Sequence, residues 1–437
     1  MSTAILNSLA QHYVDLTLCK TIYDPWDVYW FADRPFWRRQ SMRFSRDYKK
    51  YPYVDLGERK EGRTLQDIYD EADFLLSCLE LYRKSAAEAE LERVDYLIDH
   101  VRNLRTRSAV LLGHAMSFDA MTDGCYGLVA PPYDTAELDA ILADLNQTLP
   151  GNGTVGQKIR EFEKRITIPR DKVPLVLTTA SQVFHDYAVQ NMEISPNNLP
   201  RIRFRDLGGK SDFFTLLFGY EYDRIEMERI FALDRPFLVD QVVEMIGHEM
   251  EPGHLTFFEL RLKTMIDTGY PEMQIIAQYS PSSAFSEGAA RLAVYMCFDN
   301  SLEKLLDFER EIIFENGGLD KGLIECMPLW HRYRFHASYA KLEVTRNRWD
   351  KTWTTAEAGA FLERYHLVPV GTGADVADHL AIDDGHFVAH DYSRDVIRDY
   401  YRANTPNTAE QWRLYQKLCK SHISMRGIAD NSYRIDF

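Results

Sequence analysis

The most restrictive feature of the chain is the heptapeptide HEMEPGH, residues 248–254, which ends the apolar helical run FLVDQVVEMIG. A regular helix would place its two histidines ~120° apart around the axis, too far apart to share one ligand. Pro252 removes a backbone donor and disfavours the helical conformation of the residue before it, and Gly253 permits unusual backbone angles. The sequence therefore predicts a helix that breaks at Pro252-Gly253 and turns His254 back toward His248.

Two histidines brought together in this way suit zinc, which favours neutral imidazoles and a carboxylate, with three protein ligands and a water in catalytic sites. His248 and His254 would supply the imidazoles. Glu249, beside the first histidine, holds the position of the general base in short zinc motifs. The alternative interpretation is two unrelated histidines at the C-terminus of a helix that Gly253 caps.

Glu287 is the expected third ligand. It lies near the start of the segment SPSSAFSEGAARLAVYM, a predicted helix that Ser282 or Ser283 would cap, with Glu287 in its first turn. Small neighbours such as Ala284 and Gly288 would let this helix approach another closely, as a carboxylate needs if it is to reach a metal. The alternative is an acid that only complements the helix dipole.

Charge and composition exclude several classes of protein. A net charge of −15 argues against nucleic-acid binding and against an anionic membrane surface, and 45% hydrophobic residues allow a large core. The six cysteines form no C-x-x-C pair and are expected to be reduced. The N-terminus does not resemble a secretory signal, and no uncharged apolar run approaches the ~18 residues of a membrane span, so a cytoplasmic protein is expected.

Helical periodicity dominates the chain. Residues 65–117, 156–192 and most of the chain after 236 are predicted helices, residues 194–212 a loop, and residues 213–227 the best candidate strand. The aromatic-rich first 60 residues show no clear period. They are expected to be buried or to form a subunit contact, which leaves a homo-oligomer open.

The motif HE-x-x-P-G-H, followed by a helix that carries S-x-x-x-x-x-E-G-x-A, resembles uncharacterised bacterial metallopeptidase-like proteins of the gluzincin type, distant relatives of thermolysin and the oligopeptidases. The segments GYEYDRIEM, YSPSSAFSEG, SYAKLEV and HFVAHDYSRDVIRDYY are similar to further parts of that family. Together these segments cover roughly residues 200–405. The metal motif is the specific part of the resemblance, and the other segments are weaker.

The resemblance implies that His248, His254 and Glu287 bind the metal and that Glu249 is the general base. The chain departs from the family at three positions. Glu251 stands where apolar residues are usual, Leu255 where a histidine is frequent, and His390 where a tyrosine is common. These departures suggest a substrate or reaction unlike that of the family's ordinary peptidases.

Further candidates surround this motif. Tyr339 and His390 are the expected oxyanion donors, and Tyr222 and Arg224 could line the cleft. Arg332, in CMPLWHRYRFHASYAK, could bind a substrate carboxylate through its guanidinium, unless this helix merely carries a solvated basic face. The same segment also contains Arg334 and His336. His386 and His390 are four residues apart, but Gly385 before them suggests a loop, so this cluster is expected to contribute one group to the main site.

The predicted fold is mainly α, a multi-helical, metallopeptidase-like (gluzincin-like) fold with a small antiparallel sheet beside a deep cleft. A helical N-terminal lobe (1–200) would precede a catalytic metal-binding lobe (201–437). The predicted activity is hydrolysis of an amide or peptide bond in a small-molecule or short-peptide substrate. Zinc-activated water would attack, with Glu249 as the base and then the proton donor to the amine.

Two alternatives remain open. One keeps the metal in a small-molecule enzyme of specialised metabolism with non-peptidase chemistry. The other is a non-catalytic binding module, ranked last because His248, Glu249 and Glu287 are all present. Imidazole and carboxylate ligands would also suit iron or manganese.

Overall fold

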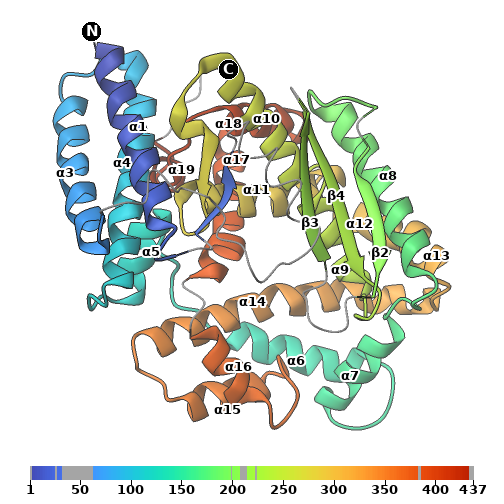
Figure 1. The fold of residues 1–437 in the computed structure, drawn as a ribbon. Helices are drawn as coiled ribbons and strands as arrows, with labels where there is room; N and C mark the ends of the chain where they lie inside the picture. Colours follow the sequence, from blue (N-terminus) through green and yellow to red (C-terminus); the bar gives the residue numbers. More distant parts are fainter. Residues whose placement is uncertain are drawn as a thin grey trace.

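The computed structural model describes residues 2–24, 27–31, 63–197, 199–206, 214–221, 224–381 and 385–432. Helices dominate it, as predicted (Figure 1). Most of the aromatic-rich N-terminal segment lies outside the described residues. No helix in the described part of the chain is long and apolar enough to cross a membrane.

The N-terminal helices pack side by side at one edge of the molecule (Figure 1). They are α1 (Ser2–Lys20), α3 (Leu65–Arg83) and α4 (Glu88–Leu111). A capping box between Thr64 and Asp67 starts α3, and Gly113, with a φ of 79°, follows the end of α4. The helices predicted over 65–117 are thereby confirmed.

Four helices lead from this layer to the sheet: α5 (Phe118–Tyr126), α6 (Ala136–Thr148), α7 (Val155–Arg165) and α8 (Val173–Asn191). The helical stretch predicted over 156–192 is two helices. The connection between them contains Pro169, which cannot continue a helix ladder, and Thr167 forms an isolated bridge with Leu238.

A three-stranded sheet follows, made of β2 (Arg201–Arg205), β3 (Phe214–Glu221) and β4 (Arg224–Ala232) in the order β2-β4-β3. The prediction of an antiparallel sheet is wrong for one of the two strand pairs. β3 and β4 are antiparallel, but β4, which lies between β2 and β3, pairs with β2 in parallel. The predicted loop 194–212 contains β2, and the single predicted strand 213–227 falls on two strands, β3 and β4, that pair antiparallel.

The remaining elements form the body around the candidate site. The first group is α9 (Val239–Val243), η1 (Glu244–His248), α10 (His254–Thr268), η2 (Pro271–Gln274), α11 (Pro281–Cys297), α12 (Leu302–Phe308), η3 (Glu309–Phe314), α13 (Glu315–Gly317) and η4 (Lys321–Cys326). The second is α14 (Met327–Trp349), α15 (Thr355–Arg364), α16 (Gly373–Leu380), η5 (Val388–Tyr392), α17 (Ser393–Asn404), α18 (Thr408–Lys420) and α19 (Met425–Ala429). The segments η1, η3 and η5 are π-helical, and η2 and η4 are 3₁₀-helical. A short antiparallel pair joins β1 (Val28–Phe31) to β5 (Ile275–Ala277).

Two hydrophobic clusters account for most of the core. One runs from Phe118 to Ile428 and draws on helices before and after the sheet. The other joins α1, α3 and α4 and includes Ile275. All six cysteines are free thiols, as expected.

Candidate metal centre

The predicted break in the histidine helix is present. The π-helical segment η1 ends at His248, and α10 starts at His254 after a turn. The amide of Gly253 donates to the carbonyl oxygen of Gly247 at 3.0 Å, and the Tyr415 hydroxyl donates to the carbonyl oxygen of Pro252 at 2.9 Å. These bonds hold the turn closed.

As predicted, the backbone of Gly253 lies outside the helical and extended regions, with φ −78° and ψ −123°. The close packing of the turn is a second reason for glycine at this position. A Cβ atom there would lie 1.9 Å from the carbonyl oxygen of His248. Only a residue without a side chain lets the turn fold this tightly against the end of η1.

Glu287 meets both histidines. Its Oε2 lies 3.1 Å from Nε2 of His248 and 3.1 Å from Nε2 of His254. A tetrahedral zinc site with bonds of ~2.05 Å separates its ligand atoms by about 3.3 Å. These three residues are a cluster whose ligand atoms all lie within 4.8 Å of one another. The donor set and its spacing therefore fit a metal of the zinc type.

Glu287 lies in the second turn of α11 and not in the first. Ser280 caps this helix and Pro281 begins it, so the start lies earlier than the predicted caps Ser282 and Ser283. Close packing of the helix is as expected. A Cβ atom on Gly288 would lie 2.6 Å from the backbone nitrogen of Arg394 in α17.

Neighbouring side chains fix the orientation of the His254 ring and keep Glu287 charged. Ser286 Oγ lies 2.9 Å from Nδ1 of His254, which leaves Nε2 of that ring toward Glu287. Burial raises the pKa of Glu287, but the nearby imidazoles, first His254 and His390, outweigh burial and hold this pKa well below 4.5. Glu287 is therefore a carboxylate.

His390 joins the site from the π-helical segment η5. Its Nδ1 lies 3.1 Å from Oε2 of Glu287. Its ring is stacked with that of His248, with centroids 6.1 Å apart, and tilted against that of His386, with centroids 3.8 Å apart. His390 therefore lies at the cluster that the sequence singled out, and its contact there is with Glu287.

Glu249 lies beside the cluster and outside it. Its Oε1 is 3.9 Å from Nε2 of His248, and its side chain is 22% exposed. A carboxylate that is close to the ligands, partly open to solvent and not one of them has the position expected of a base.

Two other predicted site residues form contacts away from the cluster. Arg332 forms an ion pair with Glu137, and Tyr339 donates its hydroxyl to Asp395. Neither residue lines the cavity described below. Tyr222 and the side chain of Arg224 lie outside the described residues.

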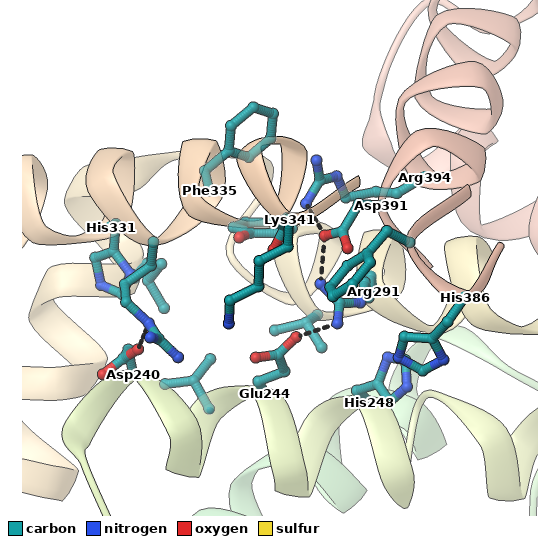
Figure 2. A pocket seen from close by; sticks show the side chains of 17 residues that line it. Asp240, Glu244, His248, Arg291, His331, Phe335, Lys341, His386, Asp391 and Arg394 are labelled. Atoms are coloured by element: carbon teal, nitrogen blue, oxygen red, sulfur yellow. Dashed lines mark hydrogen bonds and ion pairs between the residues drawn. The ribbon is translucent and has the colours of Figure 1, made fainter. Parts of the chain in front are cut away.

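A cavity of about 240 Å³ begins at His248 and extends between α9–η1 and α14 (Figure 2). All of its described lining residues lie in helical segments. The charged and imidazole side chains of the lining are Arg291, Arg334, Lys341 and Arg394, Asp240, Glu244 and Asp391, and His248, His331 and His386.

The geometry of α14 explains which of its residues reach the cavity. His331, Arg334, Ser338 and Lys341 recur at helical spacing and line it. Arg332 and Tyr339 are seven residues apart and share another face, about 160° away from that of Arg334 and Lys341. This spacing was the signal in the sequence that could have identified Arg334 and Lys341.

No protein-family model matches the chain, and no curated protein is similar to it. One solved structure, described as "a putative lipoprotein of unknown function" from Shewanella oneidensis, aligns with 98% of this chain and 87% of its own, at 12% identity and a TM-score of 0.45. A similarity at this level carries no argument about fold family or activity.

Proposed function

We propose that this protein is a metal-dependent hydrolase that cleaves an amide or peptide bond. One observation carries the proposal. Two imidazole nitrogens on either side of a broken helix, and a carboxylate oxygen from α11, converge with the spacing of a zinc site. A divalent metal ion held there would lower the pKa of a bound water and polarise the substrate carbonyl.

The protein's own groups would supply the proton transfers. Glu249 would accept a proton from the attacking water and donate it to the departing amine, because its carboxylate lies beside the ligands without belonging to them. Nδ1 of His390 contacts Glu287, so Nε2 of the same histidine ring is the nitrogen that would face a substrate oxygen. The hydroxyl of Tyr339 donates to Asp395, so Tyr339 is not part of the proposed oxyanion site.

A small-molecule enzyme that uses the same metal for non-peptidase chemistry is the second candidate. The cavity of about 240 Å³ favours it over a peptidase of long substrates, because pockets for drug-sized ligands measure about 300–1,000 Å³. Glu251, which first motivated this alternative, does not support it, since its carboxylate contacts His185.

Elemental analysis of the purified protein tests the metal, with Glu287→Ala and His254→Ala as variants that should lose it. A library of short peptides and N-acyl amino acids then tests the reaction. We expect about one divalent ion per chain and hydrolysis of small amides. A wild-type protein that binds no metal, and gains no activity when zinc, manganese or iron is added, would contradict the proposal.

A further inference from the structure

Lys341 is the one lining cation of the cavity that, in the described part of the chain, has no ion-pair or hydrogen-bond partner for its side chain. It extends from α14 into the cavity toward the helix that carries Asp240 and Glu244 (Figure 2). Burial, and then the neighbouring charge of Arg334, lower the pKa of Lys341 to about 8. Below that pH the cavity contains an ammonium group that interacts with the charges of Asp391 and Glu244 at longer range but forms no ion pair with either.

The other cations of the cavity are paired. Arg334 Nε lies 3.1 Å from Asp240, and Arg291 contacts Glu244 at 2.9 Å and Asp391 at 2.8 Å. Arg394 Nε lies 3.0 Å from Asp395. The acids that line the cavity are thereby in contact with arginines, whereas Lys341 forms no ion pair in the described part of the chain.

Lys341 is half-buried, and an ammonium group that is partly withdrawn from water and has no partner favours a ligand of opposite charge. The one ammonium group of the described lining without an ion-pair partner matches a monoanion such as a carboxylate. The cavity volume of about 240 Å³ limits the bound part to a small group.

The position of His248 at the end of the cavity connects this anion site to the reaction. A substrate whose scissile amide lies at the cluster would extend its next few atoms into the cavity. We propose that the cavity binds a free carboxylate of the substrate through Lys341, so that the substrates are small N-acyl amino acids or short peptides with an unblocked C-terminus. The assignment of the scissile bond rests on the proposed hydrolase function; the carboxylate site itself does not.

Calorimetric titration with small ligands tests the proposed carboxylate site directly. The protein is used as purified, with Glu249→Gln to prevent turnover, and the probes are N-acetylalanine, N-acetylalaninamide and inorganic phosphate. We expect the carboxylate to bind and the amide to bind more weakly. Lys341→Met should weaken carboxylate binding by about 30-fold, while Lys341→Arg, which keeps the charge, should retain most of it.

Lys164→Met is the matched control, because Lys164 is 76% exposed on α7 and outside the cavity. Circular dichroism establishes that each variant is folded. Equal binding of acid and amide, or carboxylate binding that Lys341→Met leaves unchanged, would overturn the proposal. Tighter binding of phosphate than of the carboxylate would overturn the assignment of the anion.

The pH dependence of binding is a second readout. Because Lys341 must be protonated, the dissociation constant of N-acetylalanine should be constant below pH 8 and rise about tenfold per pH unit above it. The titratable and charged groups that face the cavity from the surrounding elements are Asp240, Glu244 and His248; Arg291 and Tyr295; His331 and Arg334; and His386, Asp391 and Arg394. Lys341→Arg should remove the rise, and a rise that persists in this variant would contradict the role of Lys341.

Kinetics distinguish this inference from the proposed function. Carboxylate binding that depends on Lys341, without hydrolysis of any amide in the library, would support the anion site and contradict the hydrolase. Hydrolysis of acids and carboxamides at equal kcat/KM, unaffected by Lys341→Met, would support the hydrolase and contradict the anion site.

Discussion

The carboxylate of Glu251 lies 2.5 Å from Nδ1 of His185 in α8, although Glu251 stands within the HEMEPGH motif. Both side chains are buried, with exposed fractions of 2% and 3%. The contact joins the turn after η1 to α8. Glu251 is therefore a structural residue of the turn, and the proposed metal ligands lie at other positions.

Glu251→Ala should keep the metal and lose stability. Removing one partner of a buried pair leaves the other uncompensated and costs about 3 kcal/mol. Urea unfolding followed by circular dichroism measures this cost, and elemental analysis of the same sample measures the metal. Loss of the metal from a protein that remains folded would show instead that Glu251 is a ligand.

Gly253→Ala should lose the metal, because its Cβ atom would lie 1.9 Å from the His248 carbonyl oxygen and the turn would have to open. We expect metal affinity to fall at least about tenfold. Gly113→Ala is the matched control, since Gly113 has a φ of 79° with no atom near its Cβ position. That variant should lose about 1 kcal/mol of stability and no metal. Full metal occupancy in Gly253→Ala would contradict the need for the tight turn.

Glu249→Gln should retain the metal and lose turnover. The amide has nearly the shape of the carboxylate but cannot accept the proton, so kcat should fall about 100-fold or more. Metal content and hydrolysis of the best library substrate are to be measured on one preparation. Activity within a few-fold of wild type would exclude Glu249 as the base.

Stability should depend on Glu272 at low pH. Burial raises the pKa of Glu272, but contacts with His422 and with Arg93, both at 3.0 Å, outweigh it and lower this pKa to about 2. A depressed carboxyl pKa stabilises the fold above the unfolded value of about 4.5, and this stabilisation is lost as the pH falls from there toward 2.

The free energy of unfolding should therefore fall by about 1 kcal/mol between pH 7 and pH 4 because of this group alone. Glu272→Gln should be less stable than wild type at pH 7, and the difference should narrow at pH 4. Urea titrations at the two pH values measure both proteins. A difference that does not change with pH would contradict the role of the Glu272 charge.

The sequence alone determined the helical character of the chain and the break at Pro252-Gly253. Periodicity of apolar residues predicts α3 and α4, because a buried helix face repeats every turn. A proline followed by a glycine predicts the break, because these two residues act on their own backbone. Both features depend only on residues that are close together in the chain, so they can be identified from the sequence alone.

Only the tertiary structure decided what surrounds the motif. The insertion of β4 between β2 and β3 depends on long-range pairing. Glu251 is drawn to His185 because α8 packs against η1. Lys341 and Arg334 reach the cavity while Tyr339 does not, because packing selects which face of α14 turns toward α9 and α11. The spacing of residues defines the faces of a helix, but the face that lies at the site is chosen by the helices that pack against it.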